Sequence, residues 1–326
     1  MKNIAVVCGG YSGESVISLK SADTVLKTID SSLYTLYKVV IEKEKWEVWI
    51  ETKKYSIDKN DFSITLNNEK IIFDCVFNVI HGTPGEDGKL QGYLDLLNIP
   101  YTSCDVLTSA VTFNKEVCKR IATKANVKTA KSVLLTKKSA VNTDAIAKHT
   151  GIPCFVKPNN GGSSIGASKV TTQEMLQSAI EKAFQVDDEI LIEEYLSGTE
   201  ITCGVAILNE KPTALGITEI VSTKDFFDFD AKYENKSTQE ITPARISKEH
   251  ESECKKTSEM LYSFFECKGM IRVDYMIHNN QLYMVEINTI PGLTERSLIP
   301  QQAAYYGVSM QDLFHASIDY ALTEKN

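Results

Sequence analysis

The sequence predicts an α/β protein in which an open, largely parallel N-terminal sheet is followed by a region of antiparallel strands. In residues 1–100, apolar strands alternate with amphipathic helices, which is typical of a parallel α/β unit. Beyond residue 190 the strands are longer and follow one another across short polar turns, which favours antiparallel pairing. These two patterns predict two kinds of sheet within one chain.

The N-terminal unit has a regular order of elements. Residues 4–8 predict a buried strand, and Gly9-Gly10 leads from it into a helix with apolar residues at helical spacing. Asn67-Asn68 is typical of the turn of a hairpin, here over residues 63–73. We expect further strands at 36–41, 46–50 and 75–80, and a helix that carries Leu90, Leu94 and Leu97.

The pattern changes near residues 100 and 190. We expect helices at 108–126, 143–150, 173–184, 247–265 and 309–322, and strands at 132–135, 154–157, 190–195, 200–208 and 212–220. The predicted domains are an N-terminal Rossmann-like unit (1–100), a small central unit with a glycine-rich loop (101–190), and a C-terminal unit (191–326) that contains a long loop at 222–240.

Composition excludes several classes of protein. The chain has 326 residues, 43% hydrophobic and 24% charged, with a formal net charge of −8, which argues against a general nucleic-acid binder. No apolar run approaches the roughly 20 residues of a membrane span. The eight cysteines are scattered in apolar contexts and predict reduced core residues of a cytosolic protein.

The most informative stretch is a predicted hairpin over residues 271–288. In the first strand, alternation places Ile271, Val273, Tyr275 and Ile277 on one face and Arg272 and Asp274 on the other. In the second strand, it places Val285 and Ile287 on one face and Glu286 and Asn288 on the other. Folding at 278–281 brings Asp274 opposite Glu286. Two carboxylates and an amide beside a fixed cation suit Mg²⁺ bound to a polyphosphate, whereas the alternative is a solvated polar sheet face.

A glycine-rich loop follows the strand that ends in Lys157. Gly161, Gly162 and the hydroxyls of Ser163 and Ser164 could approach phosphate oxygens closely, and Lys157 supplies a charge. The lysine precedes the glycines, so the order is not that of a P-loop. A flexible hairpin loop is the alternative.

Two further segments suggest nucleotide contacts and a lid. The backbone of residues 192–196 could bond an adenine edge and Glu200 could hold ribose hydroxyls, although a solvated acidic turn would look similar. The long loop at 222–240 is rich in aromatic residues, which favours a lid that packs when closed.

Two strand ends of the N-terminal sheet carry polar residues toward one crevice. Glu14 follows the first strand, where a carboxylate suits a cation such as a substrate ammonium, and the missing third glycine makes nicotinamide binding a weak interpretation. His81 follows another strand and is flanked by Gly82, Glu86 and Asp87. A lone histidine there is usually structural.

In this order, the motifs resemble the ATP-grasp superfamily and, within it, the D-alanine–D-alanine ligases. The motifs are G-G-x-S-x-E, H-G-x-x-G-E-D-G, V-K-P-x-x-x-G-S-S-x-G, an A-K-Y lid triplet, R-x-D and E-x-N-T-x-P-G, and they extend from Gly9 to Pro300. The resemblance implies an N-terminal substrate-binding domain and two ATP-grasp domains that sandwich the nucleotide. It also implies a bacterial cytoplasmic enzyme that makes D-alanyl-D-alanine for peptidoglycan through an acyl phosphate.

The resemblance also implies roles for individual residues. Glu14 resembles the residue that holds the ammonium of the first D-alanine, with His81 nearby, and Arg272 the one that steadies the acyl phosphate. Ser163 and Tyr233 resemble a network that ties the lid to Glu14. The resemblance implies that Asp274, Glu286 and Asn288 bind two Mg²⁺ ions, or Mn²⁺ in their place. It implies that Ser297 and Leu298 receive the second D-alanine. The implied ATP ligands are Lys115, Lys157, Ser164, Glu193, Glu194, Tyr195, Leu196, Glu200 and Lys232.

This sequence departs from the family pattern at several positions. Gly161 replaces a frequent acidic residue, Phe227 a frequent tyrosine, and Glu295-Arg296 a small residue followed by histidine. The last change concerns the second substrate, so a D-alanine–D-lactate ligase or another ATP-grasp carboxylate–amine ligase is the alternative. Tyr233 favours D-alanine as the second substrate. A homodimer is expected by analogy with the family.

Overall fold

The structure, a computed structural model, describes residues 1–222 and 238–323. Its N-terminal sheet has the strand order β4-β3-β2-β1-β7, in which β1 is parallel to β2 and β7, whereas β2–β3 and β3–β4 are antiparallel. The prediction of a largely parallel sheet is therefore confirmed for its strands β2, β1 and β7. The antiparallel edge arises because connections this short can only reverse the chain. The strands are β1 (Lys2–Gly9), β2 (Tyr34–Ile41), β3 (Trp46–Ile50), β4 (Lys53–Ser56, not predicted) and β7 (Cys75–Asn78).

Helices and a hairpin complete the N-terminal region. The helices α1 (Ser15–Thr28) and α2 (Lys89–Leu96) follow strand ends as predicted. The predicted hairpin is confirmed as β5 (Ile64–Leu66) and β6 (Glu69–Ile71). Asn67 and Asn68 have φ angles of +51° and +66°, the left-handed conformation that a two-residue hairpin turn requires.

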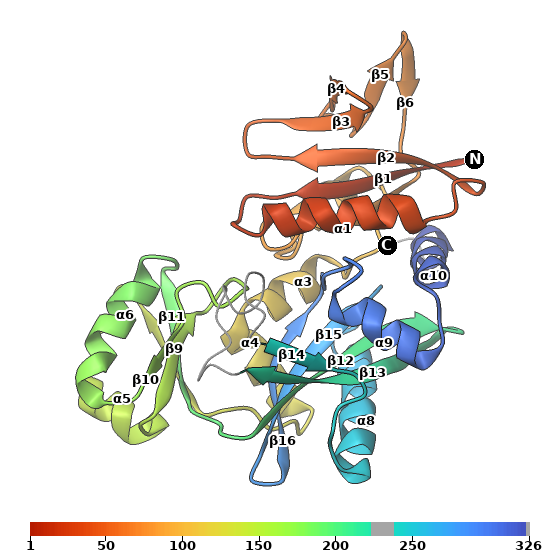
Figure 1. Ribbon diagram of the computed structural model, residues 1–326. Helices are drawn as coiled ribbons and strands as arrows, with labels where there is room; N and C mark the ends of the chain where they lie inside the picture. Colours follow the sequence, from red (N-terminus) through yellow and green to blue (C-terminus); the bar gives the residue numbers. More distant parts are fainter. Residues whose placement is uncertain (223–237, 324–326) are drawn as a thin grey trace.

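The central sheet is antiparallel, with the order β10-β9-β11-β8, and Figure 1 shows α5 and α6 on its outer side. Apolar residues of these helices and of the sheet form one core. The elements are β8 (Ser132–Thr136), α5 (Thr143–Thr150), β9 (Cys154–Pro158), β10 (Ser168–Val170), α6 (Leu176–Phe184) after a 3₁₀ turn (Gln173–Met175), and β11 (Glu189–Glu194).

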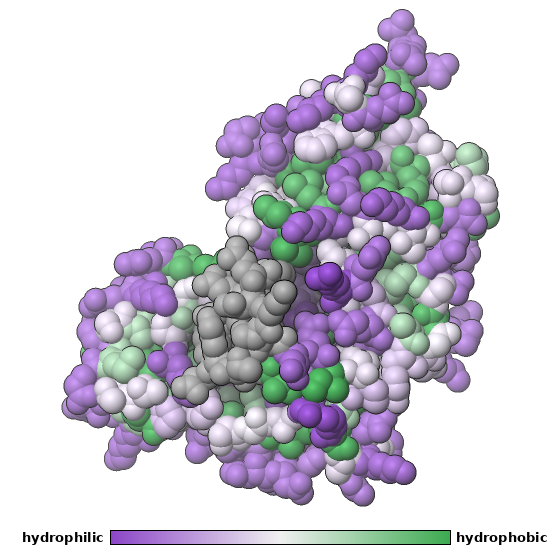
Figure 2. Space-filling model, in the orientation of Figure 1, coloured by the Kyte–Doolittle hydropathy of each residue, from purple (hydrophilic) through white to green (hydrophobic). Residues whose placement is uncertain are grey.

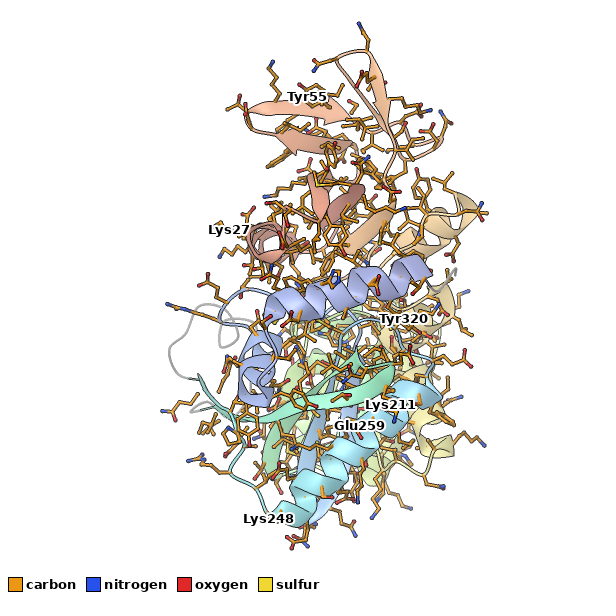
Figure 3. The ribbon with its side chains drawn as sticks, turned by 90° about the vertical axis from the view of Figure 1, so that its right-hand side faces the viewer. Lys27, Tyr55, Lys211, Lys248, Glu259 and Tyr320 are labelled. Carbon is orange, nitrogen blue, oxygen red and sulfur yellow. The ribbon has the colours of Figure 1, made fainter. Side chains whose placement is uncertain are left out.

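The third sheet has the order β14-β13-β12-β15-β16 and is antiparallel throughout. Figure 3 shows α8 lying across it, and Glu259 of α8 accepts a hydrogen bond from the backbone N–H of Ala214 in β13, 3.0 Å long. The elements are β12 (Thr199–Leu208), β13 (Lys211–Ser222), β14 (Thr238–Ile241), α8 (Lys248–Phe264), β15 (Ile271–His278), β16 (Gln281–Asn288), α9 (Leu298–Tyr306, not predicted) and α10 (Met310–Thr323).

The helix predicted over 108–126 is two helices, α3 (Val106–Phe113) and α4 (Lys115–Lys124). The prediction of one helix is wrong because Asn114 is extended, with ψ of 104°, and its side chain caps α4 by accepting a hydrogen bond from the N–H of Val117. This break sets the direction of α4, and with it that of Lys115.

The C-terminal helix α10 joins the first and third sheets. Phe314 packs edge-on against Phe77 of β7, with ring centroids 5.2 Å apart, and His315 Nδ1 lies 2.7 Å from the hydroxyl of Tyr34. The same apolar cluster includes residues of β12 and β13. Because one apolar core joins the first and third sheets, these two sheets are fixed relative to each other. The predicted division at residues 100 and 190 stays a prediction.

The described surface gives no membrane-crossing element. Within residues 1–222 and 238–323, no helix combines the length and the apolar character needed to span a bilayer. On the face drawn in Figure 2, the coloured surface is mostly hydrophilic and its hydrophobic residues lie in small groups. All eight cysteines are buried and free, as predicted.

Candidate functional site

A cavity of about 860 Å³ is lined by residues from all three sheet regions. It brings together most of the predicted site residues: Glu14, His81, Lys115, Ser163, Glu200, Arg272, Asp274, Glu286, Asn288, Ser297 and Leu298. Lys157, Ser164 and residues 193–196 do not line it. Lys232 and Tyr233 lie outside the described residues.

The hairpin of β15 and β16 forms one wall of the cavity. Asp274 is opposite Glu286 and Arg272 is opposite Asn288, which confirms the predicted pairing. Asn279 and Asn280 make the turn, with φ angles of +49° and +58°.

A register shift after Asp274 corrects the predicted inner face of this hairpin. Met284, not Val285, is opposite Tyr275, and Met284 is buried in the core whereas Val285 is half-buried. The prediction for Val285 is wrong because a β-bulge adds one residue to β16, and strict alternation along the sequence cannot foresee such an insertion.

Each carboxylate on this wall faces a cation of the protein. Arg272 donates two hydrogen bonds to Asp274, both 2.7 Å long, and Thr202 donates a third of 2.6 Å. Lys115 Nζ lies 3.3 Å from Glu286 Oε2. Burial lowers the pKa of Lys115, but Glu286 and further carboxylates outweigh it and keep that pKa above its usual value. The wall is therefore charged but balanced.

The same wall suits a metal that arrives with phosphate. Asp274 and Glu286 offer hard carboxylate oxygens, and the side-chain oxygen of Asn288 accepts the N–H of Ile290 at 3.0 Å. Within the described part of the chain, no cluster of three or more His, Cys, Asp or Glu side chains could hold an ion. Two carboxylates and an amide fit Mg²⁺, which completes its shell with water and phosphate oxygens.

The opposite wall comes from the N-terminal sheet and the glycine-rich loop. Glu14, at the start of α1, is buried and accepts a hydrogen bond from the hydroxyl of Ser163. A Cβ on Gly162 would lie 3.2 Å from a Glu14 oxygen, so glycine permits the close approach. Ser163 and Ser164 have φ angles of +51° and +56°, the left-handed conformation that is uncommon for serine.

His81 and Glu86 extend this wall. Burial lowers the pKa of His81 although Glu14 opposes the shift, and its Nε2 has no hydrogen-bond partner in residues 1–222 and 238–323. Glu86 accepts the N–H of Gly82 at 2.8 Å, and burial together with Glu14 raises its pKa to about 8. Glu86 was not among the predicted site residues, although its position in H-G-x-x-G-E-D-G was a usable signal.

A second charged cluster lies between α4 and β11. The carboxylate of Glu193 contacts Lys119 through one oxygen and Lys157 through the other. Burial raises the pKa of Glu193, but the two lysines outweigh it and lower that pKa to about 2. Lys119 was not among the predicted site residues, because a lysine one helical turn after Lys115 usually belongs to a solvated helix face. Beyond Glu193, Glu194 accepts the N–H of Lys131 at 2.8 Å, and the ring of Tyr195 packs on Phe155.

The N-terminus of α9 opens into the cavity. Ser297 precedes the helix and its hydroxyl lies 2.7 Å from that of Thr294, while Leu298 is the first helical residue. The first N–H groups of a helix lack partners within it and favour an anion, so this end suits a carboxylate. The exposed Glu295 and Arg296 line the cavity beside it.

A cavity that joins two carboxylate-bearing walls and a helix N-terminus to two antiparallel sheets is typical of an ATP-grasp carboxylate–amine ligase. The family described as "D-ala D-ala ligase N-terminus" matches residues 3–104, and "D-ala D-ala ligase C-terminus" matches residues 121–319. The chain belongs to the D-alanine–D-alanine ligase family, which confirms the resemblance seen in the sequence and its ATP-grasp fold.

Individual relatives agree with this assignment. A protein of Flavobacterium johnsoniae named D-alanine–D-alanine ligase is 50% identical over 99% of this chain and 100% of its own. The structure of the VanG D-Ala:D-Ser ligase from Enterococcus faecalis has a TM-score of 0.86, with 30% identity over 98% of both chains. The D-alanine–D-alanine ligase from Bacillus anthracis complexed with ATP has a TM-score of 0.78, with 28% identity over 99% of this chain and 98% of that one.

Proposed function

We propose that the protein joins two D-alanines into D-alanyl-D-alanine, with ATP converted to ADP and phosphate, for peptidoglycan precursor synthesis. The observation that carries the proposal is the cavity in which Glu14 faces the Arg272, Asp274 and Glu286 wall. The name of the 50% identical Flavobacterium johnsoniae relative supports the substrate.

In the first step, the carboxylate of one D-alanine attacks the γ-phosphorus of ATP, and ADP leaves. Glu14 holds the ammonium of that D-alanine, and Ser163 holds Glu14 in place. Arg272 balances the charge on the acyl phosphate. Such a transfer needs mainly positioning and charge neutralisation, which this cavity provides.

In the second step, the amine of the other D-alanine attacks the acyl carbon, and phosphate leaves after a tetrahedral intermediate. Ser297 and the N–H of Leu298 receive its carboxylate at the start of α9. Arg272 stabilises the oxyanion. His81, neutral because burial lowers its pKa, adds no positive charge beside the first ammonium.

The proposed nucleotide site takes its phosphate contacts from Lys115, Lys157 and Ser164 and its adenine and ribose contacts from the backbone of 193–196 and from Glu200. Lys232 and Tyr233, outside the described residues, keep their proposed roles as the lid lysine and the partner of Ser163. Asp274, Glu286 and Asn288 would hold two Mg²⁺ ions, or Mn²⁺, which supply positive charge to the phosphates when bound.

The proposal also covers the location and the partners of the enzyme. We propose cytoplasmic action on small molecules, D-alanine and ATP, with no nucleic-acid partner, which the net charge of −8 supports. A homodimer is proposed from the analogy with the family.

The test is a product assay with ATP, Mg²⁺ and D-alanine, alone and with D-lactate or D-serine in competition. D-lactate and D-serine address the alternative second substrates, since Glu295-Arg296 departs from the family pattern. We expect D-alanyl-D-alanine to be the main product in each mixture. A depsipeptide or D-alanyl-D-serine as the main product would reject the assignment.

A further inference from the structure

Lys119 is a buried cation that the proposed reaction does not use. It lies on α4 and is 3% exposed, and it does not line the cavity. Its ammonium contacts Glu193 Oε1 on β11, 74 positions further along the chain. A lysine is seldom buried to this degree unless a specific partner holds it, so the pair needs an explanation.

Glu193 has a second lysine on its other oxygen. Lys157 Nζ lies 2.5 Å from Glu193 Oε2. The side chains of Lys119, Glu193 and Lys157 are 4%, 9% and 15% exposed, so Lys119 lies deepest and Lys157 nearest to solvent. One buried carboxylate therefore faces two cations.

The two lysines have different freedom to leave Glu193. If Lys157 were the only counter-charge, its movement toward a phosphate would leave a buried carboxylate unpaired, which is strongly unfavourable. With Lys119 in place, Glu193 keeps one cation when Lys157 changes partner. The cluster can then lose Lys157 at low cost.

The start of α4 fixes Lys119 in this position. Asn114 caps the helix, and the N–H of Lys115 donates to the backbone oxygen of Asn159 at 3.0 Å. Lys119 comes four residues after Lys115, so the two lysines lie on one face of the helix. That face points toward Glu193 and Glu286.

We infer that Lys119 is a positioning residue: it keeps Glu193 ionised and paired, and so releases Lys157 to bind the phosphates of ATP. The inference rests on the proposed function only in taking Lys157 as a phosphate ligand. It predicts that Lys119 acts through the charge of Glu193 and not by contact with the nucleotide.

The test is a double-mutant cycle read by calorimetric binding of β,γ-imido-ATP with Mg²⁺ to the full-length protein. K119M should raise the Kd at least about tenfold, because Lys157 becomes the sole partner of Glu193. K119M/E193Q should return the Kd to within about threefold of E193Q alone, because the charge that retains Lys157 is gone. K124M, on the exposed end of the same helix, is the matched control and should bind like the wild type.

Steady-state kinetics give a second readout. K119M should raise the KM for ATP and leave the KM for the first D-alanine unchanged, a split that general loss of structure would not give. If K119M does not fold, K119Q takes its place with the same expected values.

Two results would overturn the inference while leaving the proposed function intact: a K119M Kd within about threefold of the wild type, or no recovery in the double variant. A wild-type protein that does not bind the nucleotide would instead overturn the proposed function.

Discussion

The two walls of the cavity treat their carboxylates in opposite ways. On the hairpin wall, Asp274 is held by Arg272 and Glu286 by Lys115. On the N-terminal wall, Glu14 and Glu86 accept hydrogen bonds from neutral donors, the hydroxyl of Ser163 and the N–H of Gly82. The difference follows from what each wall is proposed to bind.

A carboxylate that contacts only neutral donors has no cation to release before an incoming cation binds. Glu14 can therefore pair with the ammonium of a substrate without first losing a partner. On the hairpin wall, a metal ion would have to displace the cation that holds the carboxylate, and a phosphate would have to displace the carboxylate that holds the cation. Burial first and the charge of Glu14 second raise the pKa of Glu86 to about 8, whereas two lysines outweigh burial in the neighbouring cluster and lower the pKa of Glu193 to about 2.

The largest effect is expected at Arg272, which belongs to the hairpin wall and is proposed to act in both chemical steps. R272M should lower kcat by about 10³-fold, the size seen when one oxyanion-stabilising donor is removed. It should also lower the melting temperature, because Asp274 loses its bidentate partner. The measurements are initial rates of ADP release and thermal unfolding.

R245M is the matched control for R272M. Arg245 makes a comparable two-bond contact with Glu219 on the same sheet, but its side chain is 63% exposed and it does not line the cavity. Its kcat should match the wild type. A kcat for R272M within tenfold of the wild type would contradict the role of Arg272.

The next effect tests whether the balanced wall exchanges its cation for a metal. E286Q should raise the Mg²⁺ concentration for half-maximal activity by roughly 10- to 100-fold. It should also destabilise the free protein by about 1–2 kcal/mol, because Lys115 loses an ion partner. Magnesium titration measures the change in metal requirement, and denaturant unfolding measures the change in stability. The control variant is E259Q, on α8. An unchanged magnesium requirement would remove Glu286 from the metal site.

On the unbalanced wall, the same kind of change should affect binding but not stability. E14Q should raise the KM for the first D-alanine by roughly 10- to 100-fold, since a partly desolvated ammonium loses its charged partner. Its melting temperature should equal or exceed that of the wild type, because Glu86 loses a like-charged neighbour. If E14Q changes only the second KM, the two D-alanine subsites are reversed.

The smallest effect concerns Glu86 and pH. Its pKa rises from 4.5 to about 8 on folding, so the folded state disfavours the ionised form, and stability is lost as pH rises between these values. E86Q removes this loss. Relative to the wild type it should gain stability between pH 5 and pH 9, by about 1–2 kcal/mol because cavity water screens the charge. Unfolding of both proteins across this range measures the gap, and a gap independent of pH would contradict the shifted pKa.

Features set by neighbours in the sequence were predictable. The hairpin and its Asn279-Asn280 turn follow from local sequence, but the turn alone would place Asp274 opposite Val285, and the bulge moves the pairing to Glu286. The helix over Thr143–Thr150 was predicted to the residue. The order of motifs from Gly9 to Pro300 was sufficient to indicate the family.

Features that depend on distant contacts were not predictable. The bulge that exchanges Val285 for Met284 arises where β15 pairs with β16, whereas the break at Asn114 is made by a local asparagine cap that the prediction overlooked. Lys119 carries an ordinary charged side chain on a helix, and nothing in its local sequence indicates burial.

The sequence by itself therefore determined the class of fold, the family and the face of the hairpin that carries the charges, because local periodicity and turn chemistry decide these. Only the tertiary structure decided which carboxylates are balanced by cations and which are not. That balance depends on side chains that lie far apart in the chain, as Glu14 and Ser163 or Lys119 and Glu193 do, and on how much water their burial removes.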